Sequence, residues 1–410
     1  MSRVVKLEEL CLPDQIGKYG IPAVAEEFSE DKVRYLRITD IDDYGNLLEN
    51  DKKSVSSPEI EKYILKEGDI VFARTGNSTG RTYYHEERNG ELAFAGFLIK
   101  FSLDKSIVNP KYLKYFTISK PYKQWVDNLS NGSTRGNINA KTFADCPIIL
   151  PSREQQDYLV RVLSSLEDKI QINNQINQEL EAMTKTLYDY WFVQFDFPDQ
   201  NGNPYKSSGG KMVYHPELKW EIPEGWGVEK LKYFSKYVSD KVESSELNIE
   251  NYVGTDNMIV DMGGIELTTS IPKLGTSTKF SIEDILISNI HPYFKKIWLS
   301  DRVGGCSSDV LCIRTKKIVS REFVFATLAR DVFFNYDVAG SKGSKMPRCD
   351  KKHIMEYPIV FDFEIADQFS KIVRSIYEAV HKNYIQNQEL TQLRDWLLPM
   401  LMNGQVKVER

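Results

Sequence analysis

A stretch of roughly forty residues occurs twice in this chain, at 154–192 and again at 364–402. The tetrapeptide at 177–180, Asn-Gln-Glu-Leu, returns unchanged at 387–390, about 210 positions later. Apolar residues around it recur in steps of three and four, which place one apolar stripe along a helix. A helix of this length measures about 55–60 Å. We therefore predict two long helices, packed antiparallel with their stripes in contact.

The predicted contact between the helices is defined by residues that recur in both copies, including Met183 and its repeat Leu393. Both stripes carry an asparagine at the matching place, and a polar residue in such a seam commonly fixes register. Two unrelated core helices are the alternative, but the whole pattern repeats at one offset. We expect the interface between the helices and with partner proteins to include Leu159, Leu166, Ile170, Asn173, Leu180, Leu187, Trp191, Phe369, Ile376, Val380, Asn383, Leu390 and Leu397.

The composition sets outer limits on what this chain is. Its 410 residues suggest two to three domains. The N-terminus has no apolar signal region, and no uncharged apolar run reaches membrane-spanning length. The 5 cysteines lack a Cys-x-x-Cys pair, and no histidine pair has ligand spacing, which disfavours zinc and a disulfide framework. We expect a cytoplasmic chain with reduced thiols, no metal site and no membrane contact.

The net charge of −5 at first argues against nucleic acid, but the charge is unevenly distributed. Residues 1–69 hold 10 Lys and Arg against 16 Asp and Glu, whereas 70–141 hold 11 against 5. In the second half, 229–288 hold 6 against 10 and 289–352 hold 13 against 6. A scatter of solvated charges is the ordinary interpretation of one such segment. Because both halves show the pattern, a basic face with an acidic back is the favoured one.

The two halves repeat each other outside the helices as well. Short β-like runs separated by turns dominate the first 151 residues, and the run at 69–71 returns at 284–286. Gly, Pro and aromatic residues mark a connector after the first helix. The predicted organisation is a first domain at 1–151, a helix at 152–194, a connector at 195–227, a second domain at 228–362, a helix at 363–403 and a tail at 404–410.

Each half also carries polar loops within its basic segment. Arg or Lys can make bidentate contacts to guanine and Asn or Gln to adenine, while other basic and hydroxyl groups position phosphates. For any single residue an ordinary surface loop is the alternative. We predict DNA contacts in the first half from Arg74, Asn77, Ser78, Arg81, Ser133, Thr134, Arg135 and Asn137. In the second half we predict them from Asn289, His291, Tyr293, Lys295, Lys296, Lys342, Ser344, Lys345 and Arg348.

Several longer motifs resemble a known family. They are Trp-Phe-Val-Gln-Phe-Asp-Phe-Pro at 191–198, Gly-Asn-Pro-Tyr-Lys-Ser-Ser-Gly-Gly at 202–210, Ile-Pro-Glu-Gly-Trp at 222–226, and the ending at 393–406. In these motifs the chain resembles the specificity subunits of type I restriction–modification enzymes. The resemblance covers the entire chain, and the motifs are more specific than any single glycine motif.

The resemblance implies an α+β fold in which two β-rich target-recognition domains are joined by two long antiparallel coiled-coil helices with pseudo-two-fold symmetry. Each domain would read one half of a split site in double-stranded DNA. The helices would dock two adenine-methylating modification subunits, and restriction motor-nuclease subunits would complete the complex. S-adenosylmethionine, ATP and Mg would be bound by those partners, with no cofactor in this chain. The recognition domains vary widely in this family, so no base-reading residue transfers by motif.

Three alternatives compete with this interpretation. A self-contained methyltransferase needs an Asp/Asn-Pro-Pro-aromatic motif, and the segment at 109–112, Asn-Pro-Lys-Tyr, lacks the second proline. A nuclease site would have to be assembled from Asp14 with Asp51 and the lysines after it, in an acidic loop. No Walker A loop is present. A pure coiled-coil scaffold is disfavoured by the duplicated polar loops, so we expect a DNA-binding subunit without catalysis of its own.

Overall fold

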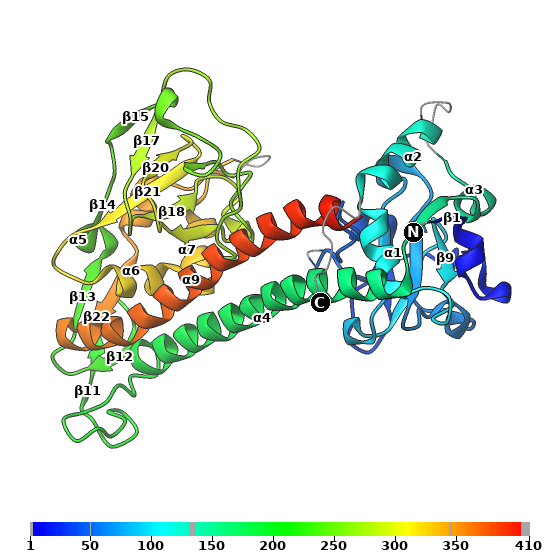
Figure 1. Cartoon of the computed structure of the whole chain (residues 1–410). Helices are drawn as coiled ribbons and strands as arrows, with labels where there is room; N and C mark the ends of the chain where they lie inside the picture. The colour runs from blue at the N-terminus through cyan, green and yellow to red at the C-terminus, as the bar shows by residue number, and fades with distance from the viewer. Residues whose placement is uncertain (1–2, 50, 131–136, 344–346, 403–410) are drawn as a thin grey trace. The chain divides into compact units, whose positions relative to one another are not determined.

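The computed structural model describes residues 3–49, 51–130, 137–343 and 347–402. The chain divides into two compact units, Met1–Gln171 with Gln386–Arg410, and Ile172–Ile385. Both division points fall inside the long helices α4 (Arg153–Phe192) and α9 (Phe363–Met402), so each helix contributes to both units (Figure 1). None of the described helices has the length and apolarity needed to cross a membrane.

The first unit is built around two four-stranded sheets and a closing strand pair. The chain enters through β1, which pairs antiparallel with β10, the strand directly before α4. One sheet has the order β2-β9-β6-β7 and the other the order β3-β5-β4-β8. The strands are β1 (Arg3–Lys6), β2 (Lys18–Tyr19), β3 (Glu26–Glu27), β4 (Arg34–Leu36), β5 (Lys53–Ser54), β6 (Asp69–Ala73), β7 (Thr82–Tyr84), β8 (Leu92–Phe94), β9 (Leu98–Ser102) and β10 (Pro147–Leu150).

Three short helices, α1 (Pro110–Thr117), α2 (Lys120–Ser130) and α3 (Ala140–Ala144), complete the first unit. Helix α1 begins with a proline, and the Asn109 side chain caps it by accepting the backbone N–H of Lys111 at 3.1 Å. The apolar face of α1 is buried with β6 and β9 in the main core of the unit. Leu159 and Leu163 of α4 are buried in the same core, and Leu397 of α9 packs against it.

The second unit repeats this architecture. Strand β13 pairs with β22, the strand before α9, and the sheet β14-β21-β18-β19 repeats β2-β9-β6-β7. The strands are β13 (Gly227–Lys230), β14 (Ser235–Tyr237), β15 (Lys241–Glu243), β16 (Tyr252–Val253), β17 (Thr276–Phe280), β18 (Ile285–Ser288), β19 (Ile297–Leu299), β20 (Gly304–Cys306), β21 (Val310–Thr315) and β22 (Pro358–Phe361). The helices are α5 (Leu231–Phe234), α6 (Arg321–Leu328), α7 (Asp331–Gly340) and α8 (Lys351–Met355).

The remaining four-stranded sheet differs between the units. In the first, β5 joins the sheet through one pair with β4, Arg34 opposite Ser54. In the second, the order is β15-β17-β20-β16, and β17 instead pairs over three residues with β20. Strand β17 has 5 residues where β5 has 2, so β17 can pair with its neighbour over a longer stretch. The α+β fold with two long helices is confirmed, and the duplication extends to strand order in one of the two sheets.

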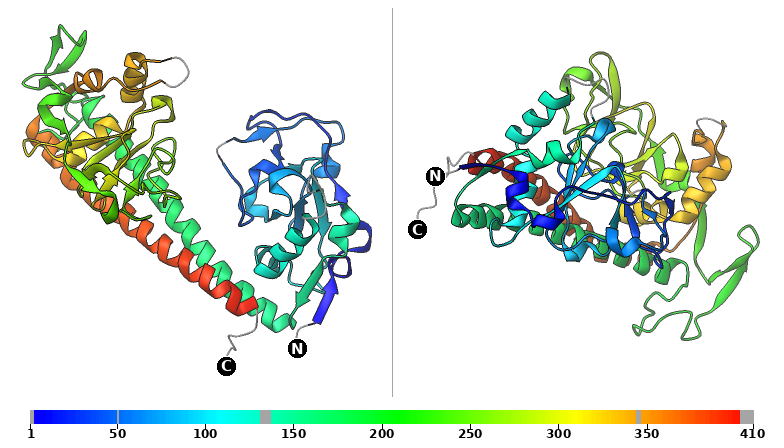
Figure 2. Two further views of the ribbon diagram at one scale, coloured as in Figure 1. Left: turned by 90° about the horizontal axis from the view of Figure 1, so that it is seen from above. Right: turned by 90° about the vertical axis from the view of Figure 1, so that its right-hand side faces the viewer.

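Within the second unit, residues 172–192 of α4 and 363–385 of α9 run side by side (Figures 1 and 2). Asn383 donates from Nδ2 to Oδ1 of Asn177 at 2.8 Å, and Trp191 lies against Phe369. Later residues of α4 thus meet earlier residues of α9, which is an antiparallel arrangement. Repeat-equivalent positions therefore do not face each other, and the asparagine opposite Asn383 is Asn177 rather than its repeat counterpart Asn173.

All thirteen residues predicted for the helix interface are at least half-buried. Leu159, Asn173, Trp191 and Phe369 are buried, and the other nine are intermediate. Three further members of the predicted stripe are not covered, since Met183 is 58%, Ile372 45% and Leu393 41% exposed. Their placement in the contact between the helices is wrong, because the apolar pattern is wider than the strip that one neighbouring helix covers.

The connector after α4 belongs to the second unit. Its strands β11 (Met212–His215) and β12 (Trp220–Pro223) form a hairpin. Phe197 stacks between Tyr205 and Trp226, with ring centroids 4.7 and 4.9 Å away. Trp226 also lies 5.7 Å from Phe192, the last residue of α4, between ring centroids, so these aromatic residues anchor the connector to the end of α4.

Candidate nucleic-acid interface

The first candidate loop lies between β6 and β7 and contains the 3-10 turn η5 (Gly76–Ser78). Asn77 is exposed, whereas Ser78 is buried. Arg81, at the end of the loop, donates from Nε to Asp43 Oδ1 at 2.7 Å and from a terminal nitrogen to the carbonyl of Ile41 at 3.0 Å. The two hydrogen bonds of the Arg81 guanidinium therefore fix the end of the loop.

Arg74 is held differently, although it begins the same loop. Its Nε donates to Oδ1 of Asn137 at 3.3 Å, and its guanidinium lies 5.0 Å from the ring centroid of Tyr19. The structure thus brings together two predicted residues, Arg74 and Asn137, across 63 positions of sequence. No sequence pattern indicated that Tyr19 contacts Arg74, because only the strand order β2-β9-β6 of the folded sheet places the two residues side by side. Ser133, Thr134 and Arg135 lie outside the described residues.

The second unit places a different turn in the equivalent position. The 3-10 turn η8 (Pro292–Phe294) lies between β18 and β19, and both flanking residues, His291 and Lys295, have left-handed backbone with φ of 50°. The Tyr293 hydroxyl bonds His291 Nδ1 at 2.9 Å. Tyr293 is 50% and Phe294 42% exposed, so this turn presents aromatic rings to solvent. The exposure of Phe294 had no sequence signal, since an isolated phenylalanine is usually buried.

The two lysines after this turn are bound within the protein. Lys295 pairs with Asp331 at 2.9 Å, and this carboxylate raises the pKa of Lys295. Lys296 donates to the carbonyl of Thr255 at 2.7 Å, and burial lowers its pKa. Neither ammonium group is an unpaired surface charge.

The remaining candidates of the second unit lie around the strand pairing of Lys342 with Arg348. Lys342 pairs with Asp350 at 2.6 Å, and Arg348 with Asp309 at 2.9 Å while staying 51% exposed. Asn289 is 6% exposed, and its Oδ1 has no hydrogen-bond partner among the described residues. In this structure Asn289 and Ser78 therefore face inward, away from a ligand at the surface. Ser344 and Lys345 lie outside the described residues.

The two loop regions share one backbone frame. In the first unit, the N–H of Arg74 donates to Phe97 at 3.1 Å and the Arg74 carbonyl accepts from Ile138 at 2.9 Å. In the second unit, Asn289 donates to Asp309 at 2.7 Å and accepts from Cys349 at 3.0 Å. Ile138 and Cys349 are each followed by the residue that caps a short helix: Asn139 caps α3 and Asp350 caps α8. Equivalent scaffolds thus carry different side chains.

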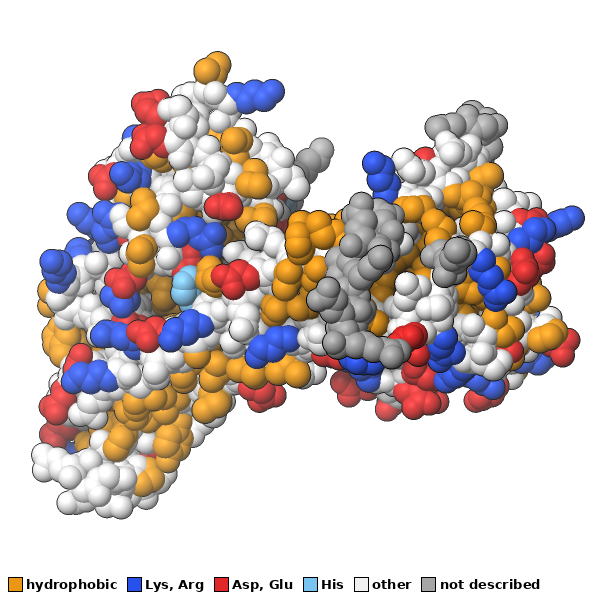
Figure 3. All heavy atoms as spheres, in the orientation of Figure 1, with side chains coloured by type: hydrophobic (Ala, Val, Ile, Leu, Met, Phe, Trp, Pro, Cys, Tyr) orange, Lys and Arg blue, Asp and Glu red, His pale blue; other side chains and the backbone are white. Residues whose placement is uncertain are grey.

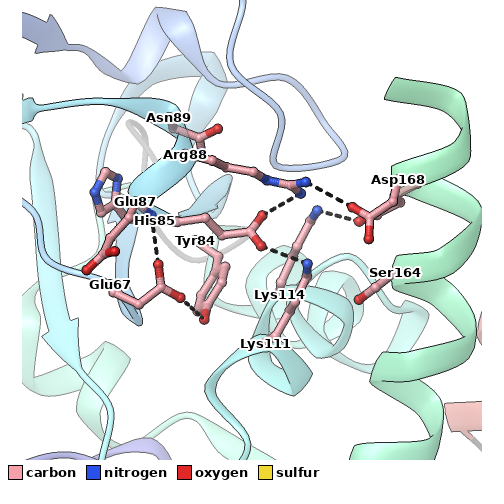
Figure 4. A network of polar contacts seen from close by, with 12 residues as sticks. Glu67, Tyr84, His85, Glu87, Arg88, Asn89, Lys111, Lys114, Ser164 and Asp168 are labelled. Carbon is pink, nitrogen blue, oxygen red and sulfur yellow. Dashed lines mark hydrogen bonds and ion pairs between the residues drawn. The ribbon is translucent and has the colours of Figure 1, made fainter. Parts of the chain in front are cut away.

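Polar contacts fasten the turn after β7 and helix α1 to α4 (Figure 4). Arg88 donates to Asp168 at 2.9 Å, and Lys114 pairs with Glu167 at 2.7 Å (Figure 4). Glu167 also accepts from the Tyr115 hydroxyl at 3.0 Å. Because Lys114 and Glu167 have only 12% and 15% of their side chains exposed, this contact is shielded and fixes the domain on the helix.

The second unit is fastened to both helices. Arg330 pairs with Asp189 of α4 at 3.0 Å, and Arg374 of α9 with Glu322 at 2.8 Å. Glu322 has a side chain 2% exposed, so the Arg374 guanidinium neutralises a charge that is otherwise costly to bury. The Tyr384 hydroxyl of α9 donates to the carbonyl of Gly263 at 3.0 Å.

The surface seen in Figure 3 does not show one continuous basic face, since Lys and Arg alternate there with Asp and Glu. Apolar side chains gather on the second unit around the end of α4 and the β11–β12 hairpin (Figure 3). The exposed apolar residues of these elements include Met183 and Tyr190 of α4, which are 58% and 37% exposed, and Tyr214 and Trp220 of the hairpin, which are 64% and 52% exposed. A patch of this kind is typical of a protein interaction site.

The described residues hold no group of three or more His, Cys, Asp or Glu side chains placed to bind a metal ion. Asp51, which the nuclease alternative requires, is bound by Arg37 at 3.1 Å, and this contact lowers the pKa of Asp51. Its carboxylate is part of a surface ion-pair cluster.

Comparison with known proteins gives matches that all have the same description. Residues 4–182 match the family described as Type I restriction modification DNA specificity domain. The chain is 24% identical to the type I restriction enzyme MjaIX specificity subunit of Methanocaldococcus jannaschii over 75% of this chain and 71% of that protein. It is 23% identical to the HindI specificity subunit of Haemophilus influenzae over 85% of this chain and 89% of that protein. The crystal structure of a type I restriction-modification system S subunit from M. genitalium shares the fold, with a TM-score of 0.55 and 14% identity over 98% of this chain and 96% of that one. Residues 4–182 of this chain thus match a type I restriction modification DNA specificity domain, and most of the chain is similar to type I restriction enzyme specificity subunits.

Proposed function

We propose that this chain is the non-catalytic DNA-recognition subunit of a type I restriction–modification complex, and that each of its two domains reads one half of a split DNA site. The observation that carries the proposal is the duplicated frame with different turns. Turn η5 exposes Asn77 where turn η8 exposes Tyr293 and Phe294. Base-edge contacts specify sequence, so different side chains on one frame would select different bases.

The long helices are proposed to dock the partner subunits. Exposed apolar residues on α4 of the second unit, Ile172, Ile176, Met183 and Tyr190, follow a helical spacing. On α9 of the first unit, Leu393 and Trp396 are 41% and 58% exposed. We propose two adenine-methylating modification subunits on these surfaces, joined by restriction motor-nuclease subunits. S-adenosylmethionine, ATP and Mg are assigned to those partners.

The cytoplasm is the proposed compartment. All 5 cysteines are free and buried. Burial raises the pKa of the Cys11 and Cys146 thiols to about 12, which keeps them protonated and poorly reactive. Such thiols suit a reducing environment.

A domain exchange tests the function. Cells expressing the full chain with its modification subunit should carry adenine methylation at one split DNA sequence, read by sequencing the modified bases. Exchanging residues 1–151 for those of a relative should rewrite one half-site and leave the other unchanged. The matched control exchanges residues 228–362 and should rewrite only the second half-site. A first-domain exchange that rewrites both half-sites would contradict the division of labour, and an absence of sequence-specific methylation with the native chain would contradict the function itself.

The assignment of cofactors to the partners has its own test. Calorimetry of the purified chain with S-adenosylmethionine should show no binding, and the same titration of the complex with the modification subunit should show it. Tight binding by the chain alone would support the methyltransferase alternative.

A further inference from the structure

Arg74 of the first unit is held in place by neighbouring side chains, and its two terminal nitrogens make no hydrogen bond to the described residues. The Arg74 guanidinium lies over the Tyr19 ring at 5.0 Å, and its Nε donates to Asn137 Oδ1 at 3.3 Å. Its two terminal nitrogens have no hydrogen-bond or ion-pair partner among the described residues. The aromatic face and the amide therefore hold one side of the guanidinium and leave the other side available.

The supports of Arg74 are themselves fixed. The Tyr19 hydroxyl accepts from the N–H of Ala140, the first residue of α3, at 3.3 Å. The backbone of Arg74 is held by Phe97 on one side and by Ile138, next to Asn137, on the other. A side chain ordered before binding loses less conformational entropy when its ligand arrives. This brace therefore favours a contact that depends on geometry as well as on charge.

We propose that Arg74 reads a guanine in the half-site bound by the first domain, with Tyr19 and Asn137 as its positioning residues. The proposal rests on the DNA-recognition function proposed above. The terminal nitrogens of arginine match the O6 and N7 acceptors that guanine presents in the major groove. Arg rather than Lys suits such a site, because its planar fork makes two parallel hydrogen bonds and stacks on an aromatic ring.

A phosphate is the other anionic group that fits an arginine fork. Phosphates recur in every DNA sequence, so a duplicated frame has reason to keep its phosphate contacts at equivalent positions. The position equivalent to Arg74 instead holds Asn289, buried at 6% exposure. The exposed arginine of the second unit, Arg348, follows the other strand of the frame and is bound to Asp309. The difference between the units favours base reading over phosphate binding.

The decisive variant is Arg74→Lys, which keeps the positive charge and removes the planar fork. Methylation mapping in cells that express the full chain with its modification subunit gives the base preference at each position. In Arg74→Lys the preference for guanine at one position of the first half-site should fall about tenfold or more, within the range typical of one bidentate contact. Every position of the second half-site should keep its preference.

Arg153→Lys is the matched control, because Arg153 lies in the same unit outside the candidate loops and its guanidinium is bound to Asp157 and the carbonyl of Lys105. It should leave the recognised sequence unchanged. Tyr19→Leu and Asn137→Ala should relax the same guanine position to a smaller extent, which a merely structural role of these residues would not do. Thermal unfolding of each purified variant checks that it folds.

Three results would overturn the proposal while the recognition function stands. They are an unchanged sequence in Arg74→Lys, relaxation at a base other than guanine, and a uniform loss of methylation in Arg74→Ala that lysine restores. The last result would identify a phosphate contact. If the native chain confers no sequence-specific methylation, the recognition function fails first and this proposal with it.

Discussion

The variant Phe369→Ala should lose about 3–5 kcal/mol of unfolding free energy in the second unit. Phe369 is 0% exposed in the core that joins α4 and α9. Its ring centroid lies 5.7, 6.1 and 5.4 Å from those of Tyr188, Trp191 and Phe192. Truncating a buried phenylalanine to alanine costs about this much, because the lost transfer free energy and the cavity left behind add together.

Urea unfolding followed by tryptophan fluorescence measures this loss, since Trp191 lies against the altered side chain. With a dependence of unfolding free energy on urea of about 1–3 kcal/mol per molar, the midpoint should fall by about 1 M or more. The transition assigned to the second unit is the one compared, because a chain with two units need not unfold in one step.

Met183→Ala is the matched control for this measurement. Met183 lies on α4 in the same unit but is 58% exposed, so its truncation should change the unfolding free energy by less than about 0.5 kcal/mol. A midpoint for Phe369→Ala that moves no further than that of Met183→Ala would refute the packing described for the helix pair.

Three further outcomes are expected. Leu180→Ala and Leu390→Ala, at half-buried positions, should each lower the unfolding free energy by about 1–2 kcal/mol, less than the roughly 2–5 kcal/mol of a fully buried leucine. A loss of unfolding free energy equal to that of Phe369→Ala would contradict this ranking. A double-mutant cycle on Lys114 and Glu167 should give a coupling of about 0.5–3 kcal/mol, whereas the more exposed pair Lys185 and Asp331, at 3.5 Å, should give less than about 0.5 kcal/mol; equal couplings would argue against the shielding of the first pair. Lys342 and the backbone N–H groups of His353 and Lys352 lower the pKa of Asp350 to about 2. The ionised Asp350 therefore stabilises the folded protein fully above the unfolded-state pKa of about 3.9, and this stabilisation is lost as the pH falls towards 2. Asp350→Ala should therefore lower the Tm at pH 7 but not near pH 2, while the uncharged cap variant Asn139→Ala should not show this pH dependence; a constant Asp350→Ala effect would count against the depressed pKa.

The helices were predictable because their signal is local and repeated. The stripe around 177–180 and 387–390 predicted helices that the structure gives as Arg153–Phe192 and Phe363–Met402. The exposure of Met183 and Leu393 was not predictable, because hydropathy identifies an apolar surface without saying what covers it.

The positions of the candidate loops were predictable from the sequence, but the roles of the side chains within them were less so. The loops at 74–81 and 289–296 were identified by polarity and charge, and they do lie in equivalent positions of two sheets. The roles within them depend on long-range pairing: Arg81 is tied to Asp43, and Arg74 to Tyr19, through strands that are distant in sequence. No local pattern distinguishes an arginine that fixes a loop from one that projects from it.

Because each unit takes segments from both long helices, the order of synthesis matters for this chain. The first unit includes residues beyond 385, and Leu397 and Leu401 pack on the core that contains Leu159. When the ribosome has added residue 171, roughly 230 residues remain to be synthesised before α9 is complete. At about 5–20 residues per second, the core around Leu159 waits on the order of 10–45 s for its last apolar neighbours. During that interval the nascent chain exposes the apolar face that Leu397 and Leu401 later cover, and transiently exposed apolar surface of this kind is prone to aggregate.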